Sequence, residues 1–449
     1  MNWSDKKILI LGLGSSGLSA ARWLTRHGAQ VSVADQASAP PAARQLQDSL
    51  PDVKLWLGHW PEEAFAGIDI IVISPGVPDS QPQIVAARAR GVAVMSDVEV
   101  FARAIPPHAR VVAITGSNGK STVTTMVGEI CKAAGLKTRV AGNIGLPALD
   151  ALDEPEQTEV YVLELSSFQL EHIDSLHCAA SVVLNLSEDH LDRYPDMQAY
   201  ANAKGRVYAM TEGVQVVNRE DPLAAALANA HGRQVSFGLD CPTGDMNYGV
   251  CDGELRRGRH TLMQSADLRV AGSHNVANAL AAWALAAELG IPDERIAECL
   301  KLFGGLPHRV QWVAGQAGID FYDDSKGTNV GATVAAMRGL SRPLVLIAGG
   351  DGKGQDFTPL SAVVRQKARA VVLIGRDAGK IAEAIADAGV PVMRAATMEE
   401  AVRVAREQAC PGDAVLLSPA CASFDMFDNY AHRARVFVSA VERLAREVA

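Results

Sequence analysis

Short apolar runs rich in Val, Ile and Leu alternate with longer helix-like segments along most of the chain. Such runs are typical of parallel strands, because helices cover both faces of a parallel sheet. The alternation therefore predicts an α/β protein built from βαβ units. The segments predicted to contain strands are 7–12, 30–35, 69–78, 92–97, 111–114, 137–145, 160–167, 181–194, 319–325, 343–350, 370–375 and 414–420.

The segment TGSNGKST (115–122) lies between a predicted strand and a predicted helix. Gly116 and Gly119 bracket a turn, and such a loop presents backbone N–H groups and a helix dipole to an anion. Lys120 adds a positive charge, and the Ser121 hydroxyl suits a Mg²⁺ held by a nucleotide. The common phosphate-loop pattern has its first glycine where this chain has Ile114, so the loop is a variant. A glycine turn with a surface lysine is the alternative, but the strand–loop–helix context favours an ATP site.

The N-terminal strand leads into Gly12-x-Gly14-x-x-Gly17 and a helix, and the next strand ends on Asp35. This pattern is typical of dinucleotide-binding domains, although the same loop suits any nucleotide diphosphate. A purely structural tight turn is the alternative. Ligands bind beyond the carboxyl ends of parallel strands, so 74–77 is expected to line the same cleft as Gly14.

Polar residues also end the strands of the central region. Glu164 ends an apolar strand, where a carboxylate is costly unless it is paired, so we interpret it as a metal ligand rather than a surface residue. His190, flanked by Asp189 and Asp192, is equally consistent with a ligand and with a solvated loop histidine. For Lys204, on a predicted helix at 197–208, the residues alone favour a solvated surface lysine.

The alanine-rich segment 275–290 predicts a buried helix, since it is too short and too polar at its start to span a bilayer. At its start, His274, Asn275 and Asn278 either cap the helix or face a base, and capping is the default interpretation. The preceding residues 214–270 predict short strands and turns of a β-rich insert, with little functional signal.

The alternating pattern predicts three domains. A chain of 449 residues exceeds one ordinary core, and GGLPHR (304–309) has the glycines and proline of an interdomain hinge. Beyond the hinge, polar groups end three strands, at 324–326, 349–353 and 418–425. The predicted domains are a Rossmann-like domain at 1–99, a central P-loop ATPase-like domain with a parallel sheet at 100–305, and a Rossmann-like domain at 306–449.

Composition narrows the function further. The formal charge is −9 and no run of five basic residues occurs, which argues against a nucleic-acid-binding protein. The seven cysteines include no CxxC pair, so neither a zinc ribbon nor a disulfide framework is expected, and their odd number fits a reducing compartment. The N-terminus lacks the apolar core of a signal peptide. We therefore expect a cytoplasmic protein without membrane contact.

Several segments, in this order, resemble the motifs of the Mur ligases: TGSNGKST, NLSEDHLDRY, SHNVANALAA, PHR, DDSKGTN, GGDGKG and SPACASFD. The N-terminal GLGSSGLSAARWL and ISPGVP resemble the family members that join D-glutamate to UDP-N-acetylmuramoyl-L-alanine. The resemblance covers all three predicted domains. It implies an ADP-forming amide ligase of peptidoglycan precursor synthesis, which uses ATP to convert a carboxylate into an acyl phosphate that an amine attacks. We also expect a monomer, although the sequence itself does not give the oligomeric state.

The resemblance assigns roles to residues that match the family's motifs. For ATP these are Gly116, Ser117, Asn118, Gly119, Lys120, Ser121, Thr122, Asn278, Arg309 and Asp324. For the UDP-linked substrate they are Gly14, Ser15, Ser16, Asp35, Ser74, Pro75, Gly76 and Asn143. For D-glutamate they are Lys326, Thr328, Lys353, Ser423 and Tyr430. The implied catalytic residues are Lys120, His190 and Lys204.

The resemblance further implies two Mg²⁺ sites, one with Ser121 and Glu164 and one with His190 and Lys204. An ammonium cannot bind a metal ion, but the family's lysine at this position is carbamylated and thereby becomes carboxylate-like. Only the resemblance overturns the surface interpretation of Lys204.

The chain departs from the family pattern in two places. Gln36 and Ala37 stand where relatives offer contacts to uracil, and Tyr430 stands where phenylalanine is common.

Three other functions compete with an amide ligase for a cell-wall precursor. A folylpolyglutamate-synthase-like ligase shares the ATP loop and the third domain, but it lacks an N-terminal nucleotide domain such as 1–99. An NAD-dependent oxidoreductase would use the N-terminal glycine loop, and NADH binding would support it. A non-enzymatic ATP-binding module does not account for polar strand ends in three domains.

Overall fold

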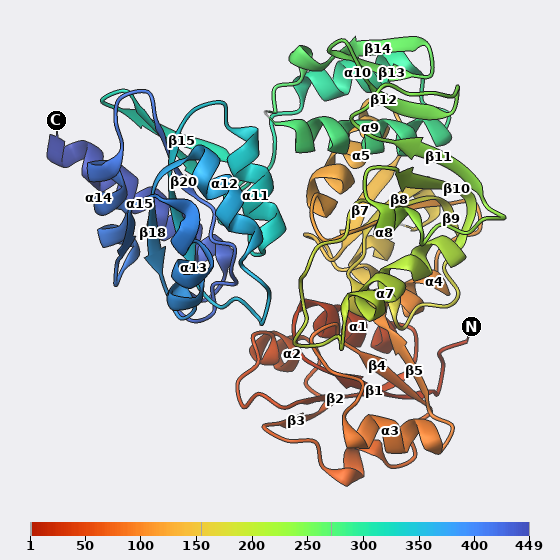
Figure 1. Cartoon of the computed structure of the whole chain (residues 1–449). Coiled ribbons are helices and arrows are strands. Elements are labelled where there is room, and N and C mark those ends of the chain that lie inside the picture. The colour runs from red at the N-terminus through yellow and green to blue at the C-terminus, as the bar shows by residue number, and fades with distance from the viewer. Residues whose placement is uncertain (1, 154, 271, 449) are drawn as a thin grey trace.

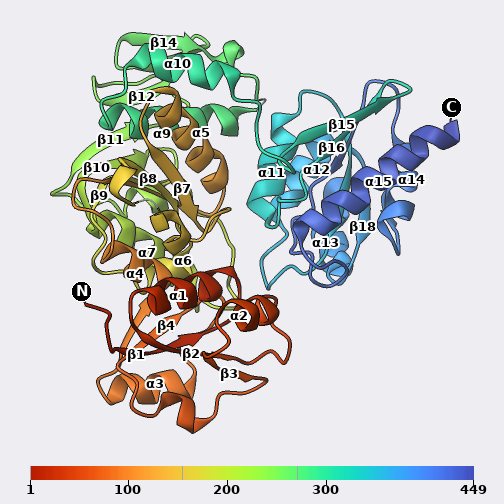
Figure 2. The ribbon, with the colours of Figure 1, turned by 180° about the vertical axis from the view of Figure 1, so that it is seen from behind.

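The structure is a computed structural model that describes residues 2–153, 155–270 and 272–448. It confirms the predicted class, because each of three α/β domains is built around its own largely parallel sheet. The N-terminal domain lies against one end of the central domain, and the C-terminal domain lies beside the central domain (Figures 1 and 2).

The N-terminal sheet is entirely parallel, in the order β3-β2-β1-β4-β5. The order changes direction at β1, and a crevice is expected at the carboxyl ends of β1 and β4. Helix α1 (Ser15–Arg26) begins directly after the glycine loop that follows β1. The strands are β1 (Lys7–Leu11), β2 (Gln30–Asp35), β3 (Lys54–Leu57), β4 (Ile70–Ile73) and β5 (Ala93–Ser96), and the other helices are α2 (Ala43–Ser49), α3 (Pro82–Ala89) and α4 (Asp97–Ala102).

The central sheet has nine strands in the order β14-β13-β12-β11-β10-β9-β6-β8-β7. All neighbouring pairs from β7 to β12 are parallel, and only β13 and β14 run antiparallel to their neighbours. Residues 214–270 are therefore not a separate insert, because their strands extend this sheet. The strands are β6 (Arg110–Thr115), β7 (Thr138–Gly142), β8 (Val160–Glu164), β9 (Cys178–Val183), β10 (Thr211–Asn218), β11 (Arg233–Phe237), β12 (Asn247–Cys251), β13 (Glu254–Arg257) and β14 (His260–Gln264).

The alanine-rich segment forms the predicted buried helix α9 (Ser273–Glu288). It packs against α5 (Lys120–Ala133) beside the central sheet, with Trp283 fully buried in the shared core. The remaining helices of this domain are α6 (Ser167–Leu170), α7 (Met197–Ala209), α8 (Pro222–Ala225) and α10 (Asp293–Leu302).

The C-terminal sheet has the order β15-β16-β20-β17-β18-β19 and is parallel except for β15. The sequence did not predict β15, β19 or the final helix α15 (Tyr430–Val448). The strands are β15 (Gln311–Gln316), β16 (Ile319–Asp323), β17 (Leu344–Gly349), β18 (Ala368–Ile374), β19 (Val392–Arg394) and β20 (Ala414–Leu417), and the other helices are α11 (Val330–Gly339), α12 (Pro359–Lys367), α13 (Ala378–Ala384) and α14 (Met398–Gln408).

The N-terminal and central domains share one continuous apolar cluster, in which Phe101 of α4 packs edge-on against Tyr161 of β8. The C-terminal domain has apolar clusters of its own. The predicted boundary at residue 99 falls inside α4. This boundary and the one predicted between residues 305 and 306 stay predictions. Among the described residues, no helix has the length and apolarity needed to cross a membrane.

One disulfide contradicts the expectation from cysteine spacing. Cys241 and Cys251 are bonded, and their Cα atoms lie 4.7 Å apart. Val250 N donates a hydrogen bond to Asp240 O. This bond brings together Cys251, which follows Val250, and Cys241, which follows Asp240. Sequence spacing did not reveal this pairing, because it depends on a contact between β12 and the loop after β11.

Candidate active site

The phosphate loop has the predicted strand–loop–helix form. Gly116 and Gly119 have φ values of 146° and 83°, which L side chains rarely adopt. A Cβ at Gly119 would lie 2.5 Å from Asn278 Oδ1, so a side chain here would also displace the Asn278 amide. Lys120 begins α5, and its Nζ donates to Gly116 O at 2.8 Å and to Ser117 O at 2.9 Å. The loop therefore already surrounds a cation at the N-terminus of a long helix, as a phosphate site requires.

The electrostatics of Lys120 fit the same interpretation. Burial lowers the pKa of its ammonium, and the nearby carboxylates of Glu164 and Asp189 oppose that shift. A desolvated ammonium gains more from a polyanion than an exposed one does, because surrounding water screens it less.

Glu164 ends β8 beside this loop and is 2% exposed. Its Oε1 accepts a hydrogen bond from Asn143 Nδ2 at 2.8 Å, whereas its Oε2 is buried without a hydrogen-bond partner. A buried carboxylate oxygen left unpaired is costly. A hard cation is the partner that a carboxylate beside a phosphate loop would take, so these residues fit Mg²⁺.

His190 lies in a turn after β9 and adopts a positive φ of 58°. Its Nε2 is 3.6 Å from Asp189 Oδ2, and burial lowers the pKa of the imidazole to about 4. The ring is therefore neutral at neutral pH, the form that binds metal ions. The geometry is compatible with the ligand interpretation, which the sequence left open.

Lys204 is 2% exposed on α7, so the surface interpretation that the residues alone favoured is wrong. Its Nζ lies 4.7 Å from the centre of the Tyr200 ring. Burial, together with the positive charge of Lys120, lowers the pKa of the Lys204 amine well below its ordinary value of 10.5. A lowered pKa favours the neutral amine, which is the nucleophilic form.

No group of three or more His, Cys, Asp or Glu side chains suited to a metal ion occurs within the described ranges. Glu164 and His190 therefore need other oxygen donors to complete a coordination shell. A hydroxyl, phosphate oxygens, water and a carboxylate-like Lys204 are donors of the kind that Mg²⁺ prefers.

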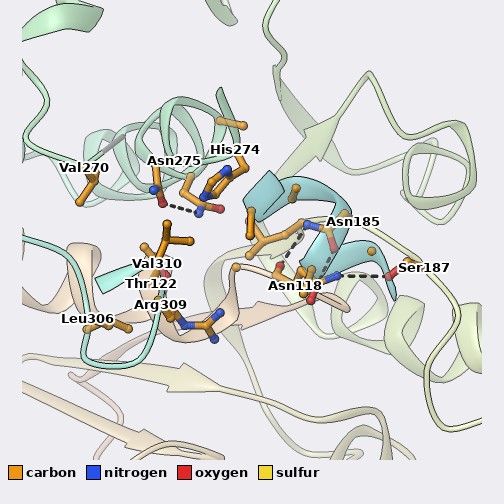
Figure 3. Close-up of a pocket in the computed structure, with 18 of the residues that line it drawn as sticks. Asn118, Thr122, Asn185, Ser187, Val270, His274, Asn275, Leu306, Arg309 and Val310 are labelled. Carbon is orange, nitrogen blue, oxygen red and sulfur yellow. Dashed lines mark hydrogen bonds between the residues drawn. The ribbon is translucent and has the colours of Figure 1, made fainter. Parts of the chain in front are cut away.

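A cavity of about 280 Å³ lies between the phosphate loop, the start of α9 and the C-terminal domain (Figure 3). Six of the residues predicted to bind ATP line it: Asn118, Gly119, Thr122, Asn278, Arg309 and Asp324. Arg309 Nη2 also lies 3.4 Å from Ser121 Oγ.

Asp324 lines the same cavity and is 5% exposed. Its Oδ2 accepts a hydrogen bond from Ser418 Oγ at 2.7 Å, and burial raises the pKa of its carboxyl to about 7. This carboxyl therefore changes charge close to neutral pH.

The capping interpretation of the α9 start is wrong. Gly272 occupies the N-cap position and no side chain caps the helix. His274, Asn275 and Asn278 instead line the cavity. Asn218 and Phe237 line it too, from the region that the sequence left without a functional signal. Only their positions at the carboxyl ends of β10 and β11 could have indicated this.

A second cavity of about 420 Å³ lies at the carboxyl ends of β1 and β4, where the sheet order changes direction. It brings together all the residues predicted for the UDP-linked substrate except Asn143: Gly14, Ser15, Ser16, Asp35, Ser74, Pro75 and Gly76. Asp35 also stabilises the glycine loop, because its carboxylate accepts hydrogen bonds from Leu13 N and Ala37 N. Asn143 lies beside Glu164 instead.

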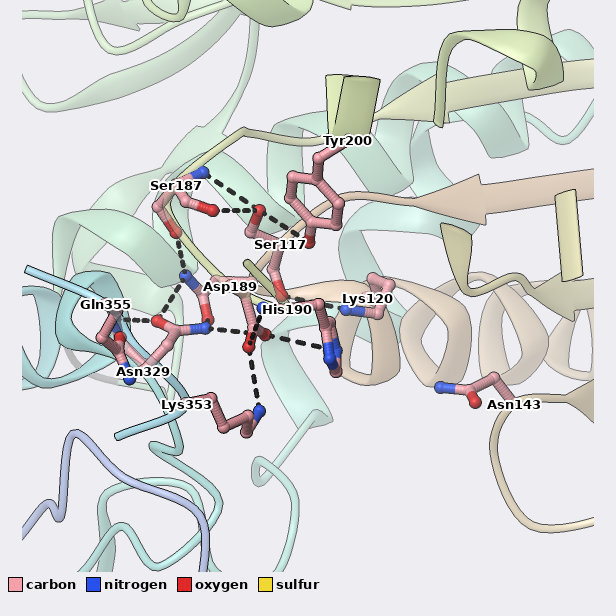
Figure 4. Close-up of polar contacts among 12 residues, drawn as sticks. Ser117, Lys120, Asn143, Ser187, Asp189, His190, Tyr200, Asn329, Lys353 and Gln355 are labelled. Atoms are coloured by element: carbon pink, nitrogen blue, oxygen red, sulfur yellow. Dashed lines mark hydrogen bonds and ion pairs between the residues drawn. The ribbon is translucent and has the colours of Figure 1, made fainter. Parts of the chain in front are cut away.

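The residues predicted for D-glutamate fall into separate contacts. Lys326 Nζ lies 3.2 Å from the Tyr430 hydroxyl and over its ring. Lys353 instead forms a 2.9 Å ion pair with Asp189 of the central domain (Figure 4). Ser423 is buried, and Thr328 N donates to Lys326 O.

Family comparisons cover most of the chain. Residues 6–96 match the Mur ligase MurD-like N-terminal domain, 114–286 the Mur ligase middle domain, and 308–421 the Mur ligase glutamate ligase domain.

Curated relatives cover nearly the whole length. The UDP-N-acetylmuramoylalanine–D-glutamate ligase of Methylobacillus flagellatus is 57% identical over 447 residues, which cover 99% of this chain and 98% of that protein. The ligase of the same name from Thiobacillus denitrificans is 57% identical over 464 residues, with the same coverage.

Solved structures share the fold. A pseudomurein peptide ligase type C from Methanothermus fervidus aligns with a TM-score of 0.63 and 20% identity, covering 98% of this chain and 100% of that one. A UDP-N-acetylmuramate-alanine ligase from Thermotoga maritima aligns with a TM-score of 0.62 and 20% identity, covering 98% and 99%. At this identity the likeness shows the fold alone.

Proposed function

Because the chain belongs to the Mur ligase family, we propose that it is an ATP-dependent, ADP-forming ligase that adds D-glutamate to UDP-N-acetylmuramoyl-L-alanine in peptidoglycan precursor synthesis. The structural observation that supports this most strongly is the buried, half-unpaired carboxylate of Glu164 beside the phosphate loop. This carboxylate suits the metal ion of a bound nucleotide, whereas hydride transfer does not require a buried carboxylate beside a phosphate loop.

The reaction needs an activated acid. The γ-phosphoryl group of ATP passes to a carboxylate oxygen of the UDP-linked substrate, which gives ADP and an acyl phosphate. The amine of D-glutamate then attacks the acyl carbon, and inorganic phosphate leaves as the amide bond forms. The amine loses a proton to water in this step. Phosphorylation is required because a free carboxylate is a poor acyl donor, and the protein contributes positioning and charge stabilisation.

The phosphate loop, residues 116–122, would hold the ATP phosphates. Lys120 would leave its two loop carbonyls for a phosphate oxygen, exchanging neutral acceptors for a charged one. Asn278 and Arg309 would contact the base and the phosphates, and Asp324 would accept hydrogen bonds from the ribose hydroxyls.

Two Mg²⁺ ions would neutralise charge on the phosphates and on the reacting carboxylate. Ser121 and Glu164 would hold one of them. His190 and Lys204 would hold the other, provided that Lys204 is carbamylated. The lowered pKa of the Lys204 amine supports this modification, since only the neutral amine reacts with CO₂.

The N-terminal cavity would bind the UDP part of the substrate, with the diphosphate at the start of α1. Gln36 lines this cavity and is available to the uracil in place of the contacts found in relatives. Asn143 would contact the muramoyl part near the reacting carboxylate.

For D-glutamate we propose a site formed by Lys326, Thr328, Lys353, Ser423 and Tyr430. Cationic and hydroxyl donors suit its two carboxylates. We further propose that the protein acts as a monomer in the cytoplasm, without nucleic-acid or membrane partners.

The direct test measures phosphate release from ATP with Mg²⁺ and UDP-N-acetylmuramoyl-L-alanine, comparing D-glutamate, L-alanine and L-lysine as acceptors. Release that depends on D-glutamate and equals the amide formed is the expected result. Absence of ADP formation with all three reactants would end the proposal. Fluorescence enhancement of added NADH would revive the oxidoreductase alternative.

A further inference from the structure

A reciprocal amide pair joins the phosphate loop to the C-terminal domain. Asn118 Nδ2 donates to Asn329 Oδ1 at 3.2 Å, and Asn329 Nδ2 donates to Asn118 Oδ1 at 3.1 Å. Asn329 is 3% exposed, so water competes little for these bonds. The two residues are 211 positions apart in the sequence, and their contact fixes one loop against the other.

Each of the two residues is also tied to its own domain. Asn329 caps α11, because its Oδ1 accepts a hydrogen bond from Ala332 N at 2.9 Å. Asn118 N donates to Asn185 Oδ1 at 2.8 Å, in the segment that follows β9. Only a side chain with both a donor and an acceptor can cap the helix and return a hydrogen bond to Asn118.

Charged and backbone contacts flank the pair on the same interface. Lys353 forms its ion pair with Asp189, and Asp356 N donates to Glu188 Oε2 at 3.0 Å. Figure 4 shows Asn329 and Lys353 of the C-terminal domain facing Asp189 of the central domain. Asn329 therefore shares this interface with other polar contacts between the same two domains.

We propose that Asn329 is a positioning residue, which fixes the amino-acid-binding segment 326–328 relative to the ATP phosphate loop. This rests on the ligase function proposed above. Asn329 directly follows Thr328 and lies three positions after Lys326, so a shift at Asn329 moves both. The acyl phosphate forms at the phosphate loop and the amine arrives from the C-terminal domain. Their separation must therefore be held within a few tenths of an ångström for attack.

Two substitutions separate this role from helix capping. Asn329→Asp keeps the capping oxygen but cannot donate to Asn118, and its charge faces Asp189. Asn329→Ser keeps a neutral capping oxygen, but its side chain is one atom shorter than asparagine and cannot keep the hydrogen bond to Asn118; it serves if the aspartate variant does not fold. Asn202→Asp is the matched control, since it makes the same charge change at an exposed amide whose oxygen accepts from Gln198.

Steady-state kinetics with all three reactants gives the readout. Both Asn329 variants should raise KM for D-glutamate about tenfold, the size expected from one or two lost hydrogen bonds, and leave KM for ATP within about threefold. Phosphate released should exceed amide formed, because a misplaced amine leaves the acyl phosphate to water. The Asn202→Asp control should resemble the wild type in each respect.

Equal changes in both KM values, or one phosphate per amide in every variant, would overturn the positioning role. Wild-type protein that releases no ADP would instead refute the ligase function itself, and the positioning role with it. If the wild type is active and the Asn329 variants have unchanged KM for D-glutamate and release one phosphate per amide, the positioning role alone is refuted.

Discussion

Replacing Lys204 with methionine should change how stability depends on pH. The burial of Lys204 holds the pKa of its amine well below 10.5 in the folded protein, whereas the unfolded chain titrates near 10.5. Between these two values the unfolded chain binds a proton at Lys204 that the folded protein does not bind. The free energy of unfolding therefore gains about 1.4 kcal/mol per pH unit from this residue as the pH rises toward 10.5.

Lys204→Met removes this contribution while keeping a side chain of similar length. Urea unfolding of both proteins, without nucleotide and in CO₂-depleted buffer, measures the free energy of unfolding at several pH values. The free energy of unfolding of the wild type, minus that of Lys204→Met, should rise by about 2 to 3 kcal/mol over two pH units between the folded and unfolded pKa values of Lys204. Lys132→Met, on the exposed side of α5, is the control for the loss of one positive charge.

Bicarbonate provides a second arm of the same experiment. If Lys204 forms a carbamate, added bicarbonate at mildly alkaline pH should stabilise the wild type and leave Lys204→Met unchanged. Parallel pH slopes for the wild type and Lys204→Met would refute the argument, because they would mean that the amine titrates alike in both states.

Three further substitutions test the remaining groups. Lys120→Ala should abolish phosphate release from ATP, yet calorimetry should find UDP-N-acetylmuramoyl-L-alanine bound within about threefold of the wild-type affinity, since its UDP part would lie in the N-terminal domain. Glu164→Gln should lower kcat by about 10²-fold or more and weaken the Mg²⁺ dependence of the rate, because an amide replaces a charged oxygen donor; an unchanged magnesium titration would contradict this. The pKa of Asp324 is raised to about 7, so wild-type KM for ATP should fall as the pH rises through 7, while Asp324→Asn should show a flat profile.

Local sequence predicted the strands well where an apolar run is buried on both faces. Strands β1, β4, β6 and β17 are of this kind, since each is built mostly from buried aliphatic residues. In contrast, β15 and β19 are edge strands with exposed residues, so no apolar run marks them. The disulfide was missed for a different reason, because it depends on a contact between segments that spacing does not show.

In the candidate site, too, features set by adjacent residues could be predicted and features set by contacts between distant segments could not. The phosphate loop is local, and its glycines, lysine and helix start could be recognised from adjacent residues. The burial of Lys204 depends on the packing of α7 against the central sheet, which a helical pattern alone does not reveal. Similarly, Gly272 takes the N-cap position of α9 and leaves Asn275 and Asn278 facing the cavity, which capping preferences predicted wrongly.

The cations of this site have protein acceptors that a substrate can replace. Lys120 donates to two neutral carbonyls, and Lys353 pairs with Asp189. Exchange at Lys120 gains a charge-assisted bond, because a phosphate oxygen is a stronger acceptor than a carbonyl. If a D-glutamate carboxylate replaced Asp189 as the partner of Lys353, one carboxylate would take the place of another, and Asp189 would be left unpaired beside His190. If Lys120 holds the ATP phosphates as proposed, nucleotide binding would gain net energy from this lysine. If Lys353 and segment 326–328 hold D-glutamate as proposed, its binding would gain little from Lys353 and would depend on how accurately segment 326–328 is placed.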